Sequence, residues 1–273
     1  MTPIGIFDSG YGGLTVLDSI RARLPHYDYI YLGDNARAPY GPRSFDIVYR
    51  FTLQAVRKLF SLGCPLVILA CNTASAKALR TIQQRDLPRL APHYRVLGVI
   101  RPTVEALPCI THNQHVGILA TEGTIQSHSY PLEIAKLMPQ ATVSGVACPL
   151  WAALVEAGEH TGAGADYFVS KRIKQLLATD PLIDAILLAC THYPLLLPKI
   201  RQFTPPGITI VPQGSYVAES LADYLDRHTE MRERLTRGAT CRYLTTEAAD
   251  KFSLSATLFL RHPVPVQHIE LTD

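Results

Sequence analysis

The stretch Val67-Ile-Leu-Ala-Cys71-Asn72-Thr73-Ala74 is an apolar run that ends in a cysteine and continues into small polar residues. This pattern predicts a buried strand, a tight turn and the start of a helix. The chain repeats it once, as Ala185-Ile-Leu-Leu-Ala-Cys190-Thr191-His192. We therefore predict that each half of the chain supplies one thiol to a shared pocket.

Composition and charge narrow the class of protein. The chain has 273 residues, of which 47% are hydrophobic and 18% charged, as in ordinary globular proteins of two domains. A net charge of +3, with no run of Lys and Arg, gives no indication of nucleic-acid binding. The N-terminus lacks an apolar segment with basic flanks, and the most apolar window, 59–76, contains Gly63 and Pro65. We predict no signal peptide, no membrane span and a cytoplasmic protein with reduced thiols.

Strand and helix patterns alternate along the whole chain. The predicted strands span 4–7, 29–32, 67–70, 95–100, 116–120, 142–147, 185–189, 208–211, 241–244 and 266–271. Such alternation is typical of α/β folds, and we predict two doubly wound parallel-sheet domains related by pseudo-two-fold symmetry. The first would comprise 1–99 plus 208–273 and the second 100–207. The active site would lie in the cleft between them.

Two loops at strand ends are candidates for ligand binding. Asp8 and Ser9 begin a glycine-rich turn between a strand and a helix, where backbone N–H groups can approach an anion. The spacing of its glycines differs from the dinucleotide-binding fingerprint. A second loop contains Pro39, Tyr40 and Gly41, and its two prolines make it stiff enough to present Tyr40 or backbone donors. Either loop could also be a simple connection.

The six cysteines fall into two groups. A lone cysteine in apolar surroundings is usually part of the core, and we predict this for Cys64, Cys109, Cys148 and Cys241. Cys71 and Cys190 differ, because each follows a buried strand and precedes a predicted helix start, whose positive end favours thiolate. No set of Cys and His residues has the spacing of a metal site.

Two facing thiols could form a disulfide or act together as acid and base. If a small carbon acid lay between them, one thiolate could remove its proton while the other thiol protonated the opposite face. That exchange inverts a stereocentre without a cofactor. Ser9, Asn72, Thr73 and Thr191 could hold a carboxylate of the substrate. Asp8 and Glu156 could receive its amino group.

Seven motifs, in order, resemble one known family. They are Gly5-Ile-Phe-Asp8-Ser9-Gly-x-Gly-Gly-Leu-Thr-Val-Leu17, Leu32-Gly-Asp-x-Ala-Arg-x-Pro39-Tyr40-Gly41, Ala70-Cys71-Asn72-Thr73-Ala74, Thr121-x-Gly-Thr124-Ile-x-Ser127, Ala147-Cys-Pro-Leu150, Leu154-Val-Glu156 and Cys190-Thr191-His192-Tyr-Pro-Leu. The chain resembles the glutamate racemases of the cofactor-independent aspartate/glutamate racemase superfamily. It departs from their pattern at Asn35, often Thr, and at Arg101, often Glu.

The resemblance implies interconversion of L- and D-glutamate without cofactor or metal, supplying D-glutamate for peptidoglycan. It implies that Cys71 acts on the α-proton of D-glutamate and Cys190 on that of L-glutamate. Asp8, His192 and Glu156 would tune the thiols or relay protons. The implied substrate-binding residues are Asp8, Ser9, Pro39, Tyr40, Gly41, Asn72, Thr73, Thr121, Thr124, Thr191 and His192.

Three other functions remain open at this point. A racemase for aspartate, or for another small amino acid, would share the same motifs. A cysteine hydrolase could use Cys190 and His192, although residues two apart rarely form a nucleophile–base pair and Cys71 would have no role. A non-catalytic amino-acid-binding protein would hold the same ligand without exchanging its α-proton. The expected partner is a small molecule, with no nucleic acid or membrane, and the chain could form a homodimer.

Overall fold

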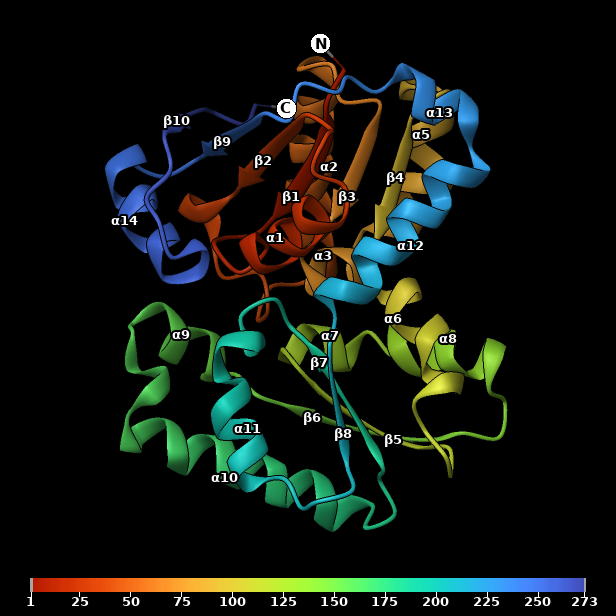
Figure 1. Ribbon diagram of the computed structural model, residues 1–273, viewed down its shortest axis with the longest axis vertical. Helices are drawn as coiled ribbons and strands as arrows, with labels where there is room; N and C mark the ends of the chain where they lie inside the picture. The colour runs from red at the N-terminus through yellow and green to blue at the C-terminus, as the bar shows by residue number, and fades with distance from the viewer. Residues whose placement is uncertain (1, 273) are drawn as a thin grey trace.

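The computed structural model describes residues 2–272 and contains two parallel sheets, one above the other in Figure 1. The predicted α/β class with parallel sheets is confirmed. The first sheet has the order β10-β9-β2-β1-β3-β4 and the second β6-β5-β7-β8. The strands are β1 (Ile4–Asp8), β2 (Tyr29–Gly33), β3 (Leu66–Leu69), β4 (Arg95–Gly98), β5 (His115–Ala120), β6 (Thr142–Ala147), β7 (Ala185–Ala189), β8 (Thr209–Pro212), β9 (Cys241–Thr245) and β10 (Val266–His268).

Helices connect successive strands of each sheet and cover its faces (Figure 1). They are α1 (Leu14–Arg23), α2 (Phe45–Ser61), α3 (Asn72–Lys77), α4 (Leu79–Thr81), α5 (Leu87–Leu90), α6 (Ile100–Ala106), α7 (Glu122–Gln126), α8 (Ser129–Leu137), α9 (Trp151–Glu156), α10 (Ala163–Thr179), α11 (Leu197–Phe203), α12 (Gly214–Arg227), α13 (Thr229–Arg234) and α14 (Ala249–Leu260). Short 3₁₀ turns lie at Asn35–Arg37, Leu107–Cys109, Glu159–Thr161 and Tyr193–Leu196, and a π turn lies at Ile82–Asp86.

The strand order repeats between the sheets. The order β2-β1-β3-β4 of the first sheet has the same connectivity as β6-β5-β7-β8 of the second, with each strand replaced by the one four places later in the chain. Cys71 follows β3 and Cys190 follows β7, so the two thiols occupy equivalent places in the repeat. This arrangement agrees with the duplication inferred from the two cysteine motifs.

One domain boundary of the sequence interpretation requires correction. Residues 208–211 were assigned to the first domain, but β8 pairs in parallel with β7 and completes the second sheet. The second crossing between the sheets therefore lies after Pro212, where α12 begins and packs against α1 of the first domain. The rest of the tail does return, because β9 pairs with β2 and β10 with β9.

Apolar sequence explains the central strands. Every residue of β1, β3 and β7 is buried, as expected for parallel strands covered on both faces by helices. The helix α2 begins after Ser44, whose side chain accepts a hydrogen bond from the backbone N–H of Ile47. Thr121 caps α7 in the same way by accepting from the N–H of Thr124.

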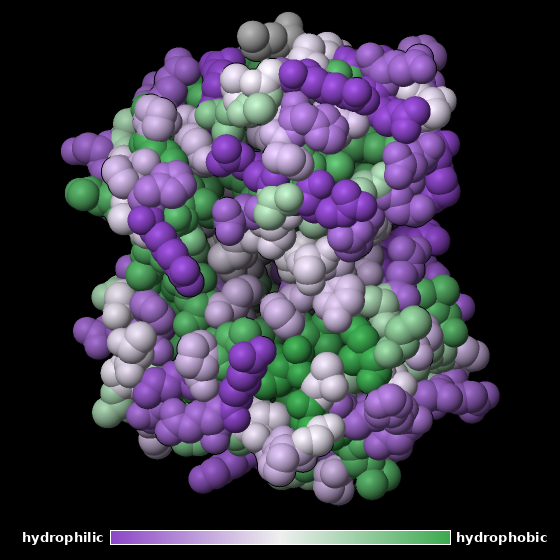
Figure 2. All heavy atoms as spheres, in the orientation of Figure 1, coloured by the Kyte–Doolittle hydropathy of each residue, from purple (hydrophilic) through white to green (hydrophobic). Residues whose placement is uncertain are grey.

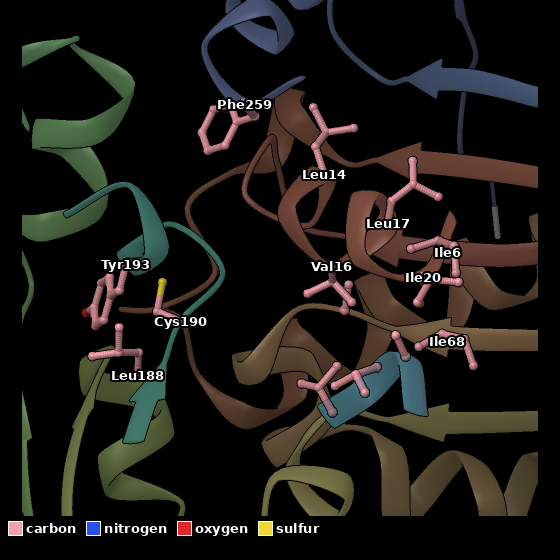
Figure 3. Packing of buried hydrophobic residues seen from close by; sticks show 14 of the residues in the cluster. Ile6, Leu14, Val16, Leu17, Ile20, Ile68, Leu188, Cys190, Tyr193 and Phe259 are labelled. Carbon is pink, nitrogen blue, oxygen red and sulfur yellow. The ribbon is translucent and has the colours of Figure 1, made fainter. Parts of the chain in front are cut away.

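One apolar cluster joins the two sheets. It includes Leu14 and Val16 of α1 together with Leu188 of β7 and Tyr193 of the 3₁₀ turn that follows. Figure 3 shows these two groups on either side of the loops between them, with Cys190 beside Tyr193. The sheets are thus fixed to each other by packed side chains as well as by the two chain crossings.

The exposed surface is mixed. In Figure 2 hydrophilic side chains cover most of the outer rim, whereas hydrophobic ones gather over the middle, around the second sheet. Within residues 2–272, none of the helices combines the length and apolar character that crossing a membrane requires.

Candidate active site

Cys71 lies at the turn between β3 and α3 and is the N-cap residue of that helix. Its Sγ accepts a hydrogen bond from the backbone N–H of Ala74 at 3.4 Å and lies 3.4 Å from the Ser9 Oγ. The side chain is buried. The helix start is thus where the sequence predicted it.

The start of this helix was expected to lower the pKa of Cys71, but other influences are stronger. Burial, followed by the nearby Asp8 carboxylate, raises the pKa of the Cys71 thiol to about 12, although the Ser9 and Ala74 hydrogen bonds act in the opposite direction. The Cys190 sulfur also contributes to this rise, so the two thiols share one electrostatic environment. These surroundings therefore favour the neutral thiol of Cys71.

Cys190 follows β7 and belongs to a row of three side chains. Its Sγ lies 3.8 Å from the Nδ1 of His192, whose Nε2 lies 2.8 Å from the Glu156 Oε1. Both Cys190 and His192 are buried, whereas the Glu156 side chain is 39% exposed. The expected α-helix start is replaced by a 3₁₀ turn at Tyr193–Leu196, and the next α-helix, α11, begins only at Leu197.

The neighbours of His192 favour its charged form. Burial alone would lower the pKa of His192, but the Cys190 sulfur and the Glu156 carboxylate raise it to about 10. A protonated imidazole donates from both ring nitrogens. His192 can therefore donate to the sulfur of Cys190 while its other N–H is held by Glu156.

Asp8, the last residue of β1, lies next to the second domain just before the glycine-rich turn. Asp8 is fully buried, and its Oδ2 accepts a hydrogen bond from the Gly10 N–H at 3.0 Å, while the Thr191 Oγ1 lies 3.5 Å from its Oδ1. Burial raises the pKa of the Asp8 carboxyl, and the charge of His192 offsets only part of that rise. The turn must contain Gly12, because a Cβ there would lie 2.3 Å from the Thr191 Oγ1.

Three threonine hydroxyls form a second contact between the domains. The Thr73 Oγ1, from α3, lies 2.9 Å from the Thr121 Oγ1 and 3.4 Å from the Thr124 Oγ1, both at the start of α7. Hydroxyls both donate and accept, so such a group suits a carboxylate oxygen. The structure thus brings together three predicted residues. Thr73 is more than forty positions away from both Thr121 and Thr124 in the chain.

The loop containing Pro39, Tyr40 and Gly41 closes against the same helix. The Gly41 carbonyl accepts a hydrogen bond from the Gly123 N–H at 2.9 Å. The Tyr40 hydroxyl, however, is used inside the first domain, where it donates to the buried Asp34 carboxylate. Because the Tyr40 hydroxyl already donates its hydrogen to Asp34, we expect the backbone of this loop to bind a ligand rather than that hydroxyl.

Asn72 is held by partners that the sequence did not reveal. Its Nδ2 donates to the Gln213 Oε1 at 2.6 Å, and its Oδ1 accepts from the Tyr130 hydroxyl at 2.6 Å. Asp34 is a second omission, since it is fully buried and accepts from Arg37 as well as Tyr40. Neither Gln213 nor Tyr130 lies in a recognisable motif, so only a three-dimensional arrangement could single them out.

The remaining cysteines and possible metal ligands lie outside this arrangement. Cys64 and Cys148 are buried as predicted, Cys241 is half-buried, and Cys109 is exposed rather than part of the core, because the 3₁₀ turn that contains it lies at the surface. Across residues 2–272 no group of three or more His, Cys, Asp or Glu side chains has the geometry to hold a metal ion.

Comparison with known proteins places the chain in a family. Residues 14–218 match the family model Asp/Glu/Hydantoin racemase. The chain is 41% identical over 271 residues to the glutamate racemase of Paracoccus denitrificans, covering 96% of this chain and 97% of that one. Its fold is similar to the glutamate racemase isoform RacE1 of Bacillus anthracis, with a TM-score of 0.86, 32% identity and coverage of 99% and 98%.

A ligand-bound structure has the same fold. The glutamate racemase of Francisella tularensis in complex with D-glutamate aligns with a TM-score of 0.86 and 29% identity, covering 99% of this chain and 98% of that one. These similarities extend over both sheets and over both cysteine turns. The chain belongs to the Asp/Glu/hydantoin racemase family.

Proposed function

We propose that this protein interconverts L- and D-glutamate by a two-base mechanism in which Cys71 and Cys190 exchange roles. The observation that supports this most strongly is the equivalent position of the two thiols. Each follows the third strand of a repeated four-strand unit. Thr191, next to Cys190, lies 3.5 Å from Asp8, and both Asp8 and Cys190 are close enough to Cys71 to raise its pKa. Two thiols supplied in this way by two halves suit a reaction that must act on both faces of one carbon.

The proton balance of the reaction is simple. With D-glutamate bound, the Cys71 thiolate takes the α-proton and becomes a thiol, leaving a carbanion stabilised through the adjacent carboxylate. The Cys190 thiol then gives its proton to the opposite face and becomes a thiolate, which yields L-glutamate. The reverse direction begins at Cys190, and the thiols return to their starting states by exchanging protons with surrounding groups.

In this proposal, the positive charge of the substrate promotes the thiolate form of Cys71. Burial and Asp8 keep Cys71 neutral at neutral pH, because its pKa is about 12. The positive α-amino group of a bound amino acid favours a nearby thiolate and opposes the influence of Asp8. On the other side, the charged His192 lies where it can donate to the sulfur of Cys190.

The polar groups around the thiols fit the three charged groups of glutamate. Ser9, Asn72 and Thr191 lie next to the two sulfurs and suit the α-carboxylate, with Asp8 and Glu156 on the side of the amino group. The hydroxyls of Thr73, Thr121 and Thr124, with the backbone at Pro39–Gly41, suit the side-chain carboxylate. His192 is the last residue of the proposed substrate-binding set, and it acts through its contact with the Cys190 sulfur.

The names of the relatives favour glutamate over aspartate. Proteins similar over nearly the whole chain are glutamate racemases, and one of the solved structures holds D-glutamate. An aspartate racemase from Picrophilus torridus shares only 17% identity with the chain, which shows a common fold and no more. Aspartate or another small amino acid therefore stays the second candidate substrate.

The wider role follows from the proposed product. D-Glutamate is a component of bacterial peptidoglycan, and we propose that the protein supplies it in the cytoplasm without cofactor or metal. A homodimer is part of this proposal only as a prediction. Sedimentation velocity of the purified protein would test it, with a monomer at micromolar concentration as the contradicting result.

The test of the reaction is incubation with L-glutamate or D-glutamate in heavy water, following optical rotation and α-deuteration together. Both signals should change in parallel with the wild-type protein. Cys71→Ala and Cys190→Ala should each abolish racemisation in both directions, because each removes one of the two required bases. Cys64→Ala, which removes another buried thiol, is the matched control and should stay active. Near-normal turnover in either active-site variant would contradict the mechanism, and activity on aspartate alone would contradict the substrate.

A further inference from the structure

We propose that Gln213 is a positioning residue for the Cys71 half of the reaction. Through Asn72 it fixes the turn that carries Cys71, and it ties this turn to both places where the chain crosses between the sheets. This inference rests on the proposed racemase function and adds a residue that neither the motifs nor the comparisons single out.

Gln213 makes three hydrogen bonds with its side-chain amide. Its Oε1 accepts from the Asn72 Nδ2 at 2.6 Å. Its Nε2 donates to the Tyr130 hydroxyl at 2.5 Å and to the Thr103 Oγ1 at 3.0 Å. The Tyr130 hydroxyl in turn donates to the Asn72 Oδ1, which closes a ring of three side chains.

The four members of this network come from separate elements that meet at the junction of the domains. Asn72 is the first residue of α3, and Tyr130 lies in α8. Thr103 lies in α6, directly after the first crossing, and Gln213 lies between β8 and α12, at the second crossing. Figure 1 shows α6, α8 and the start of α12 side by side beneath α3.

Burial restricts the orientations that the side chains of this network can adopt. Asn72, Tyr130, Gln213 and Thr103 are each at most 3% exposed, so water cannot replace a missing partner. A buried polar group without a partner costs about 1–3 kcal/mol, which is why each member holds the others in one orientation. Thr103 is fixed as well, since its hydroxyl donates to the Val99 carbonyl at 2.9 Å.

The orientation of the Asn72 amide is therefore decided by Gln213 and Tyr130. Its nitrogen faces Gln213 and its oxygen faces Tyr130, so one N–H remains for other partners. Asn72 adjoins Cys71, and the same turn carries the N–H of Ala74 that donates to the sulfur. A shift of this turn would move the Cys71 sulfur relative to the α-carbon, and a misplacement of about 1 Å can cost about 100-fold in rate.

A positioning role predicts an asymmetric kinetic signature. The two enantiomers are equally stable, so kcat/KM falls equally in both directions for every variant. The isotope effects need not be equal, because Cys71 removes the proton only from D-glutamate. If Gln213 supports Cys71, its loss makes the Cys71 step more limiting. The primary isotope effect with α-deuterated D-glutamate should then rise, and that with α-deuterated L-glutamate should fall.

The experiment compares Gln213→Leu with Tyr130→Phe and Thr103→Val, which each remove one hydroxyl from the network. Tyr29→Phe is the matched control, since it removes a buried hydroxyl that donates only to the Leu24 carbonyl within the first domain. Gln213→Leu should lower kcat/KM by about 10- to 100-fold. The two hydroxyl variants should show the same pattern more weakly, which keeps the proposal testable if Gln213→Leu does not fold.

The outcomes separate this inference from the proposed function. Opposite shifts of the two isotope effects, absent in Tyr29→Phe, support the inference. Unchanged isotope effects in every network variant, or shifts in the reverse sense, overturn it while leaving an active wild-type racemase intact. A wild-type protein that does not racemise glutamate overturns the proposed function and this inference with it.

Discussion

Replacing Glu156 by Gln tests whether this carboxylate keeps His192 protonated beside Cys190. The variant keeps the shape of the side chain but removes the charge that lies 2.8 Å from the His192 Nε2. A hydrogen bond to a charged group contributes about 1.5–3 kcal/mol. Because Glu156 is 39% exposed, water screens it, and the lower end of that range applies. One pKa unit corresponds to about 1.4 kcal/mol, so we expect the pKa of His192 to fall by about one unit from its value of about 10.

The same change alters how stability depends on pH. The folded-state pKa of His192 is raised above its ordinary value of 6.5, so its contribution to stability is complete below pH 6.5 and is lost as the pH rises towards 10. In Glu156→Gln the contribution should be smaller, and its loss should be complete at a lower pH. Urea unfolding at a series of pH values from 6 to 10 measures this difference, with the pH range taken from those two pKa values.

The assay for the pKa itself is an NMR titration of the His192 ring in the wild type and the variant. Asp180→Asn is the control, because it removes the carboxylate of another histidine pair, 2.8 Å from the His115 Nδ1. It should leave the His192 signal unchanged. If Glu156→Gln also leaves the midpoint unchanged, Glu156 does not hold the proton on His192 and the reasoning from geometry is wrong.

Three further predictions concern packing and reactivity. Gly12→Ala should destabilise the fold by about 1–3 kcal/mol in urea unfolding, because its Cβ would lie 2.3 Å from a threonine hydroxyl of the second domain. Gly164→Ala is the control, since no atom lies within 4 Å of the new Cβ, and its free energy of unfolding should stay within about 1 kcal/mol of the wild type. Asp34→Ala should lower the free energy of unfolding by about 3 kcal/mol or more in the same measurement, since an arginine and a tyrosine hydroxyl lose a fully buried acceptor. A smaller decrease would show that water enters the site. Iodoacetamide followed by mass spectrometry should label exposed Cys109 well before buried Cys71, whereas equal rates would show that Cys71 is already a thiolate.

The strongest sequence patterns predicted the central strands and both thiol turns. Strands such as β3 and β7 are buried on both faces, so their sequences are continuous apolar runs that fit no exposed element. The caps at Ser44 and Thr121 are local features of the same kind, because each places a side-chain oxygen three residues before the N–H that it binds. Local physics was sufficient wherever the stabilising contact is close in sequence.

The errors and omissions concern contacts between distant parts of the chain. The sequence predicts a strand at 208–211, and β8 lies at Thr209–Pro212, but the pattern does not reveal which sheet this strand joins, and it pairs with β7 rather than with the first sheet. Gln213 and Asn72 are 141 positions apart, and each is an ordinary polar residue in its own segment. Burial of such polar groups depends on which elements meet at the domain junction, and one sequence does not contain that information in a local form.

The environment of Cys71 fits the proposed binding of a charged ligand. A helix start and two hydrogen bonds favour the thiolate, yet burial and a buried carboxylate oppose it more strongly, and the pKa is raised to about 12. A nucleophilic cysteine in permanent use would need the opposite balance. A base that acts only on a bound amino acid does not, because the substrate brings the positive charge that stabilises the thiolate. Under the proposed mechanism, the same burial that raises the pKa of Cys71 would also exclude water from the bound substrate, so that one feature would serve both protection of the thiol and proton transfer.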